Sequence, residues 1–140
     1  MVLAPFHLAF PVYDIDATRV FYGEVLGCEI GRKAERWIDF DFFGHQLSAH
    51  LVNDQNNATV TNQVDCQAVP ARHFGVVLPE HAWEQLLARL NQHDIDFYIP
   101  PYTRFAGAVG EQRTFFIKDP SDNYLEFKSF RDQAAMFNKS

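Results

Sequence analysis

The sequence predicts an α+β fold built from two tandem βαβββ modules, because the same order of features occurs twice along the chain. Two short apolar runs, residues 6–12 and 72–78, are strand-like, and each has a histidine in second place, His7 and His73. Each run is followed by a segment with the apolar spacing of a helix, and then by three more strand-like stretches. The predicted order is therefore β, α, β, β, β, and then the same again.

Both predicted helices carry local signals. Asp14 is a good N-cap for the first helix, and Gly27 is a good stop after its last turn. In the second helix, residues 83–90 place apolar side chains at positions i, i+3, i+4 and i+7, which indicates one buried face. The predicted strands after the two helices are 29–32, 36–43 and 45–52, and then 97–99, 112–118 and 123–130.

We expect a single domain, residues 1–140, because this length suits one hydrophobic core. The connector is rich in Asn, Gln, Asp and Thr and has no helical period, so we expect it to be a surface loop. The expected parts are a first module at 1–52, a connector at 53–70, a second module at 71–131 and a tail at 132–140.

Composition excludes several classes of partner. The apolar fraction of 47% is enough for a folded core, and the net charge of −6 argues against nucleic acid and anionic membranes as partners. No apolar run reaches the ~18 residues of a membrane span. Cys28 and Cys66 lack the close spacing of a zinc knuckle. The first residues lack the basic region that begins a signal peptide. We therefore expect a cytoplasmic protein that acts on a small molecule.

Strand parity separates the two histidines from the bulky side chains. His7 shares its strand face with Ala9, and His73 shares its face with Gly75, whereas the large apolar residues of both runs lie on the other face. Glu126, in the last predicted strand, alternates with Leu125 in the same way. Both modules thus place a histidine beside small residues, where there is room for a ligand.

Two imidazoles and one carboxylate form the facial triad that suits Fe(II) and leaves coordination positions open for substrate and dioxygen. His7, His73 and Glu126 are the candidate ligands. The ordinary alternatives are two strand histidines with local partners and a salt bridge from Glu126 to Lys128. The equivalent placement of the histidines in both halves favours the metal site.

The chain resembles the vicinal oxygen chelate superfamily, which includes glyoxalase I, bleomycin resistance proteins and extradiol dioxygenases. The resemblance runs from about residue 6 to residue 130 and rests on Phe6-His-Leu-Ala, on Phe-Tyr-x-x-x-Leu-Gly at 21–27 and on Asp-Pro-x-x-Asn-x-x-Glu at 119–126. It implies two βαβββ modules whose sheets form an open barrel-like cleft. It also implies that His7, His73 and Glu126 occupy the first, third and fourth ligand positions of the family.

The second ligand position departs from the family's lyases, which usually place Glu or Gln there. Aligning the ends of the two modules puts Ser48, a poor ligand, opposite Glu126. Gln46 and His50 share the strand face of Ser48. Three protein ligands would match the dioxygenase branch, whereas a fourth ligand from Gln46 or His50 would give a glyoxalase-like site. His50 is also the candidate catalytic acid or base, because imidazole titrates near pH ~6.5.

The resemblance implies, first, a metal-dependent dioxygenase that oxidises a catechol-like substrate on a divalent ion, most naturally Fe(II). A lyase or isomerase using Zn, Mn or Ni is one alternative, and a metal-free protein that binds aromatic drugs is another. A homodimer is possible because the family exchanges modules between chains. The candidate substrate-binding residues are Tyr98, Tyr102, Phe105, Arg113 and Tyr124.

Overall fold

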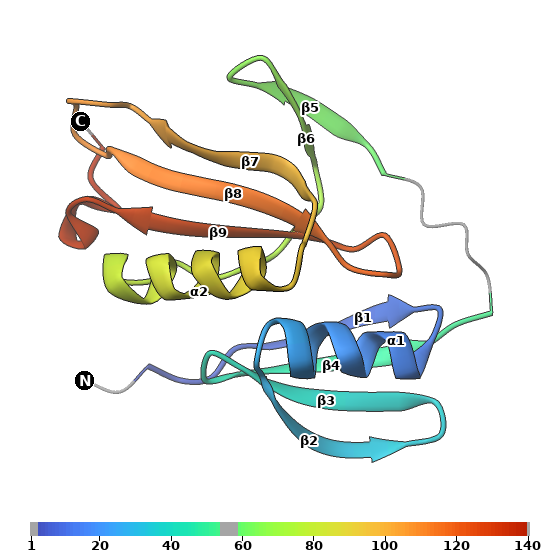
Figure 1. Ribbon diagram of the computed structural model, residues 1–140. Coiled ribbons are helices and arrows are strands. Elements are labelled where there is room, and N and C mark those ends of the chain that lie inside the picture. The colour runs from blue at the N-terminus through green and yellow to red at the C-terminus, as the bar shows by residue number, and fades with distance from the viewer. Residues whose placement is uncertain (1–2, 54–58, 140) are drawn as a thin grey trace. The chain divides into compact units, whose positions relative to one another are not determined.

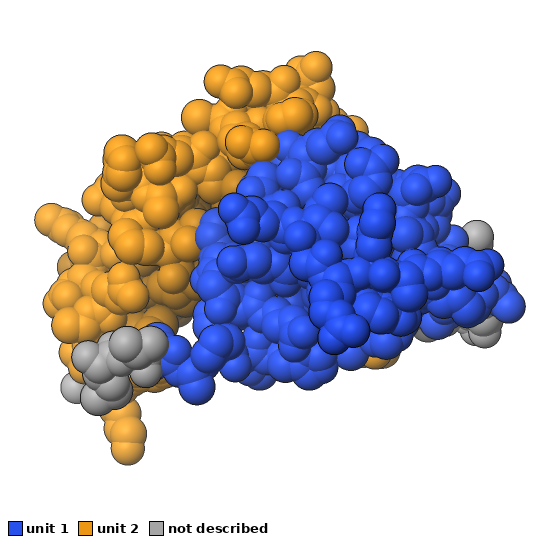
Figure 2. Space-filling model, turned by 90° about the horizontal axis from the view of Figure 1, so that it is seen from below, with its two compact units in different colours: residues 1–57, 119–123 blue, residues 58–118, 124–140 orange. Residues whose placement is uncertain are grey.

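The computed structural model describes residues 3–53 and 59–139 (Figure 1). The chain divides into two compact units, which Figure 2 shows in different colours. Unit 1 comprises Met1–Asn57 and Asp119–Asn123, and unit 2 comprises Ala58–Lys118 and Tyr124–Ser140. The short segment 119–123 thus leaves the second half of the chain and belongs to the first compact unit.

Unit 1 contains a four-stranded sheet in the order β1-β4-β3-β2. Strand β1 is parallel to β4, and the other neighbouring strands are antiparallel. The predicted βαβββ order of the first half is therefore confirmed. The strands are β1 (His7–Val12), β2 (Glu29–Ala34), β3 (Trp37–Phe42) and β4 (His45–Leu51).

One helical segment covers one face of this sheet (Figure 1). It begins as α1 (Ile15–Arg19) and continues as a π-helical stretch, η1 (Val20–Val25). Asp14 caps it, since its Oδ1 accepts a hydrogen bond of 2.9 Å from the Ala17 backbone N–H, and Gly27 ends it with a φ of 78°. The core beneath contains Phe10, Val12, Tyr22, Leu26, Ile38, Phe40 and Leu47.

Unit 2 repeats this arrangement with a weaker first strand. Its sheet has the order β7-β8-β9, all antiparallel, and residues 74–77 run parallel to β9 through two isolated bridges. The predicted strand 72–78 is thus reduced to bridges, although its direction matches that of β1. The strands are β7 (Phe97–Arg104), β8 (Gln112–Lys118) and β9 (Tyr124–Phe130).

Helix α2 (Glu80–Gln92) covers one face of the unit 2 sheet (Figure 1). Trp83, Leu86 and Leu90 are buried at the predicted spacing. The Trp83 ring packs on Phe115, and its Nε1 donates to the Phe127 carbonyl at 2.9 Å. A short 3₁₀ turn (Gln133–Ala135) follows the last strand.

The expectation that the connector is a loop is wrong for its second half. Residues 61–70 form a hairpin of β5 (Thr61–Val64) and β6 (Gln67–Pro70), while residues 54–58 lie outside the described part of the chain. Val64 and Val69 pack against Ile99, Phe116 and Tyr102. Because Phe116 alternates with Phe115 along β8, this hairpin lies on the sheet face that α2 does not cover.

Hydrogen bonds to Asp119 hold segment 119–123 in unit 1. The Asp119 carboxylate accepts hydrogen bonds from the Tyr22 hydroxyl at 2.8 Å and from the backbone N–H groups of Ser121 and Asn123. Burial raises the pKa of the Asp119 carboxyl, although the hydrogen bonds from Asn123, Tyr22 and Ser121 oppose the rise. Burial, together with the Asp119 charge, also raises the pKa of Tyr22.

The predicted α+β class is confirmed, and none of the three described sheets closes into a barrel. Among the helices of the described residues, none is long and apolar enough to cross a membrane.

Candidate metal centre

His73 and Glu126 meet on the face of the unit 2 sheet opposite α2, where the β5–β6 hairpin also packs. His73 Nε2 lies 3.1 Å from Glu126 Oε1. The segment that carries His73 reaches β9 closely, and the Glu126 backbone N–H donates to the Phe74 carbonyl at 2.8 Å. Gly75 permits this approach, because a Cβ at that position would lie 1.6 Å from the Glu126 carbonyl oxygen.

The second ring nitrogen of His73 determines which nitrogen faces Glu126. His73 Nδ1 lies 2.7 Å from the Pro70 carbonyl oxygen, which can only accept, so Nδ1 is the donor. In the neutral ring, Nε2 then carries the free lone pair. Two lone-pair atoms 3.1 Å apart need a cation between them, either the proton of an imidazolium or a metal ion.

Glu126 is held in place on its other side. It is 8% exposed, its Oε2 accepts a hydrogen bond of 2.5 Å from the Thr114 hydroxyl, and its Oε1 lies 3.9 Å from Lys128 Nζ. Burial alone would raise the pKa of Glu126, but the hydrogen bonds from His73 and Thr114 and the charges of Lys128 and His73 lower it overall. The carboxylate therefore stays ionised, which a metal ligand requires.

His73 responds in the opposite direction. The hydrogen bond to Glu126 raises the pKa of His73, and the Pro70 carbonyl adds to this, while burial and the Lys128 charge oppose it. Direct contact with Glu126 thus favours the protonated form of His73, and contact with His73 favours the ionised form of Glu126.

The chemistry of this pair fits a divalent metal ion. Two ligands at right angles, each about 2.1 Å from an ion, lie about 3 Å apart, and the pair matches that separation. The Pro70 carbonyl is the kind of outer partner that orients metal-binding histidines. Among the residues that the structure describes, no group of three or more His, Cys, Asp and Glu side chains is placed to hold a metal ion.

His7 lies on β1 in unit 1, on the sheet face opposite α1, and is exposed. Its Nδ1 is 2.9 Å from Gln46 Oε1 on the neighbouring strand β4, where the register pairs the two residues. The predicted ligands therefore come from both units: His73 and Glu126 from unit 2, and His7 from unit 1. The three-residue metal site stays a prediction.

The register of the sheets gives the unit 1 counterpart of Glu126. Leu8 pairs with Leu47 in unit 1 as Phe74 pairs with Leu125 in unit 2, so Ser48 corresponds to Glu126. Ser48 is buried, and its hydroxyl donates to Asp39 Oδ1 at 2.7 Å. This agrees with the sequence alignment of the two modules.

His50, the predicted catalytic residue, lies two positions further along β4. It is exposed and pairs with Trp37 on β3 and with Pro11 on β1. By strand alternation it shares the face of Gln46 and Ser48. Its acid or base role stays a prediction.

The three predicted substrate-binding tyrosines lie in unit 2, on or beside the sheet face that carries Glu126. The rings of Tyr98 and Tyr124 meet edge to face, 4.8 Å apart. The Tyr102 hydroxyl donates to Asp65 Oδ2 at 3.0 Å, and Arg104 Nε donates to the same oxygen at 2.5 Å. Burial and the contact with Asp65 raise the pKa of Tyr102.

The other two predicted substrate residues are placed differently. Phe105 is 53% exposed and lies under the Arg104 guanidinium, with 4.8 Å to the ring centroid. Arg113 lies on the α2 side of the sheet, stacks 4.2 Å from the Trp83 ring centroid and donates to Glu84. Because Arg113 alternates with Thr114 on β8, it points away from the face that carries Glu126.

Sequence reasoning missed two polar residues of these faces, Asp39 and Thr114. Each is paired by register with a neighbour on the next strand, Asp39 with Ser48 and Thr114 with Lys128. Strand alternation gives only the face on which each side chain lies, and the register between strands is needed to identify its partner.

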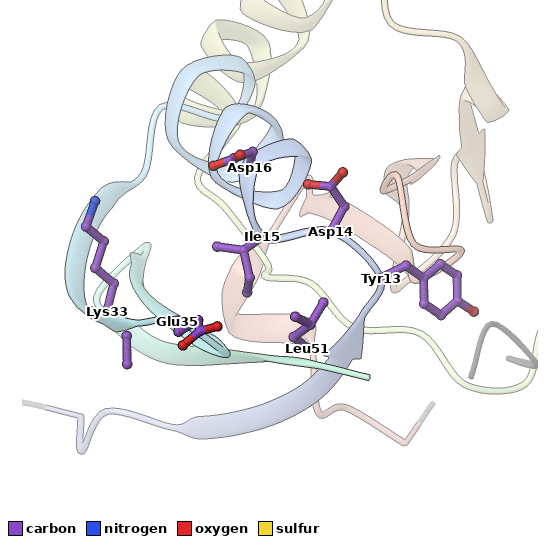
Figure 3. A pocket seen from close by; sticks show the side chains of 8 residues that line it. Tyr13, Asp14, Ile15, Asp16, Lys33, Glu35 and Leu51 are labelled. Atoms are coloured by element: carbon purple, nitrogen blue, oxygen red, sulfur yellow. The ribbon is translucent and has the colours of Figure 1, made fainter. Parts of the chain in front are cut away.

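A separate pocket of about 530 Å³ lies in unit 1, where the start of α1 faces the β2–β3 hairpin (Figure 3). Figure 3 shows Tyr13, Asp14 and Asp16 on one side of it, and Lys33 and Glu35 on the other. None of the predicted site residues lines this pocket. It is therefore distinct from the candidate metal ligands.

Comparison with known proteins agrees with this architecture. The sequence model of the Glyoxalase/Bleomycin resistance protein/Dioxygenase superfamily matches residues 5–127. A solved structure from Alicyclobacillus acidocaldarius, described as a glyoxalase/bleomycin resistance protein/dioxygenase, is 36% identical, with a TM-score of 0.81 and 96% of each chain covered.

Two more distant structures share the fold. The fosfomycin resistance protein FosX from Listeria monocytogenes is 14% identical with a TM-score of 0.70, covering 97% of this chain and 99% of that one. Lactoylglutathione lyase from Agrobacterium tumefaciens is 18% identical with a TM-score of 0.63, covering 90% and 92%. By the match over residues 5–127 and the 36% identity to the Alicyclobacillus protein, this chain belongs to the glyoxalase/bleomycin resistance protein/dioxygenase superfamily.

Proposed function

We propose that this protein is a metal-dependent enzyme in which His7, His73 and Glu126 hold one divalent cation. The observation that carries the proposal is the 3.1 Å approach of His73 Nε2 to Glu126 Oε1. The Pro70 carbonyl engages His73 Nδ1 and the Thr114 hydroxyl engages Glu126 Oε2, which leaves Nε2 and Oε1 in contact with each other. His7 contributes the third ligand atom from its Nε2.

The proposed reaction is the oxidation of a catechol-like substrate by dioxygen, with Fe(II) as the metal. Of the β4 side chains that could add a fourth ligand, Gln46 Oε1 contacts His7 and the Ser48 hydroxyl donates to Asp39. We assign the third, the exposed His50, to proton transfer. Three protein ligands leave positions open for two substrate oxygens and dioxygen. A bound divalent ion supplies Lewis acidity, which lowers the pKa of a substrate hydroxyl and stabilises developing negative charge.

The residues of the chain have separate tasks in this proposal. His50 transfers the proton released from a substrate hydroxyl, because a neutral imidazole has one nitrogen that donates and one that accepts. Tyr98, Tyr102 and Tyr124 contact the aromatic ring of the substrate. Lys128, 3.9 Å from Glu126, adds positive charge beside the carboxylate.

The test begins with elemental analysis of protein purified without chelator, followed by anaerobic loading with Fe(II), Mn, Ni or Zn. Loaded protein is then given a panel of catechols in an oxygen electrode. We expect oxygen uptake that requires Fe(II) and is lost in His73→Ala, whereas His81→Ala, which removes an exposed imidazole from α2, retains it. Full turnover of a thiol adduct without oxygen would replace the dioxygenase with a lyase. Tight binding of an aromatic drug by metal-free wild-type protein, without turnover, would replace the enzyme with a binding protein.

A further inference from the structure

A chain of hydrogen bonds on the open face of unit 1 ends at His7. It starts at Asp39 on β3, whose Oδ1 accepts from the buried Ser48 hydroxyl at 2.7 Å. Asp39 Oδ2 accepts from Gln46 Nε2 at 3.3 Å, and Gln46 Oε1 lies 2.9 Å from His7 Nδ1. Three neighbouring strands, β3, β4 and β1, thus carry one continuous polar connection.

The direction of every hydrogen bond in this chain follows from Asp39. An ionised carboxylate can only accept, so the amide NH₂ of Gln46 has to face it. The amide oxygen of Gln46 then faces His7, and an oxygen can only accept as well. His7 Nδ1 is therefore the protonated nitrogen, and the lone pair of the neutral ring lies on Nε2.

We infer that Asp39 is a positioning residue that holds His7 in the Nδ1–H tautomer through the amide of Gln46. Ser48 fixes the carboxylate, since its hydroxyl occupies the other oxygen. The Pro70 carbonyl imposes the same tautomer on His73 in unit 2. Both histidines thus present Nε2, one through a backbone carbonyl and the other through two side chains. The effect on metal binding rests on the proposed function, but the tautomer assignment does not.

Asp39→Asn tests this directly. Asparagine can donate as well as accept, so Gln46 loses the constraint that orients its amide. The matched control is Asp41→Asn, two residues along the same strand. The Asp41 carboxylate accepts from the Gly44 backbone N–H, which an asparagine oxygen can also do.

The readout is the tautomer of His7 in metal-free protein at pH 8.5, measured by long-range ¹H–¹⁵N correlation in the imidazole ring. We expect one Nδ1–H tautomer in the wild type and in Asp41→Asn, and a mixture of both tautomers in Asp39→Asn. Gln46→Leu leaves the Asp39–Ser48 contact in place and is expected to give the same mixture. Unchanged His7 tautomers in folded Asp39→Asn and folded Gln46→Leu would overturn the inference.

Metal titration of the same variants separates this inference from the proposed function. Loss of an outer hydrogen-bond partner lowers metal affinity by roughly 10–100-fold, and we expect this for Asp39→Asn but not for Asp41→Asn. If the tautomer changes in Asp39→Asn but the wild type binds no divalent ion, the positioning role stands and the proposed function falls. If the wild type binds metal and Asp39→Asn binds it equally well, the positioning role is overturned for metal binding.

Discussion

Units 1 and 2 share a topology but distribute charge differently on the sheet faces opposite their helices. In each unit, a segment that carries a histidine runs parallel to the last strand, which is antiparallel to its neighbour. In unit 2 the carboxylate stands on the last strand as Glu126 and contacts the histidine directly. In unit 1 the same place holds Ser48, and the carboxylate stands one strand away as Asp39. Both units thus carry the histidine, but only unit 2 has a carboxylate at this position of the last strand.

This difference assigns unequal tasks to the two units. Unit 2 carries a histidine in direct contact with a carboxylate, and unit 1 carries an imidazole oriented by a chain of side chains. Substitutions at equivalent positions of the two units should therefore have unequal effects on metal affinity and on stability.

The largest difference in metal affinity is expected between the variants Glu126→Gln and Ser48→Ala. Losing the only anionic ligand should lower metal affinity by more than about 100-fold, beyond the effect known for outer partners. Ser48→Ala, at the equivalent position, should change affinity by less than about 10-fold. Isothermal titration with Mn or Fe(II) measures both. Equal losses in the two variants would contradict the division of tasks.

The next largest effect is expected on the stability of the fold, at Gly75, whose counterpart in unit 1 is Ala9. A methyl group at Gly75 would meet the Glu126 carbonyl oxygen, so Gly75→Ala should cost about 3 kcal/mol in the free energy of unfolding. The reverse exchange, Ala9→Gly, should cost only ~0.5–1 kcal/mol, through backbone entropy. Urea unfolding of both variants measures this. A Gly75→Ala variant as stable as the wild type would show that the approach to β9 is looser than described.

Thr114→Val should have a smaller effect, confined to unit 2. The change keeps the shape of a fully buried side chain but leaves Glu126 Oε2 without its hydroxyl donor. We expect a stability loss of about 1–3 kcal/mol and a fall in metal affinity of roughly 10-fold. Thr114→Ser retains the hydroxyl and serves as the control. Loss of affinity in the serine variant equal to that in the valine variant would point to packing and not to the hydrogen bond.

The smallest effect is a pH dependence of unit 1. Burial raises the folded-state pKa of Asp119 above its unfolded value, so the folded protein binds this proton more tightly. The contribution to stability is then full below the unfolded pKa of ~3.9 and is lost as the pH rises through the folded value. The stability difference between wild type and Asp119→Asn should therefore shrink from pH 4 to pH 7. A stability difference that grows from pH 4 to pH 7 would show that folding lowers the pKa of Asp119. Asp122→Asn is the control for removing a charge from the same loop.

Much of the fold was predictable because the repeat and the strand alternation are local properties of the chain. Alternation correctly placed His7, His73 and Glu126 on faces away from the two helices. The Asp14 cap and the Gly27 stop also needed only local information, since each acts within one turn of its helix.

Other elements depended on contacts that the sequence does not display. The β5–β6 hairpin turns at Asp65 and Cys66, both with positive φ, in place of the Asn-Gly or Asp-Gly pair that usually indicates such a turn. Strand β7 continues through Pro100 and Pro101, which a strand tolerates because it lies at the edge of its sheet. Asp39 escaped notice because its partners lie on another strand and only the register brings them together.

The proposed metal site consists of His7, His73 and Glu126 around one divalent ion. A crystal structure of metal-loaded protein, with anomalous diffraction recorded at the absorption edge of the metal, tests it most directly. We expect one strong peak within about 2.0–2.2 Å of His7 Nε2, His73 Nε2 and a Glu126 oxygen. A peak held by other side chains, or His73 and Glu126 joined only by a proton in protein saturated with metal, would contradict it.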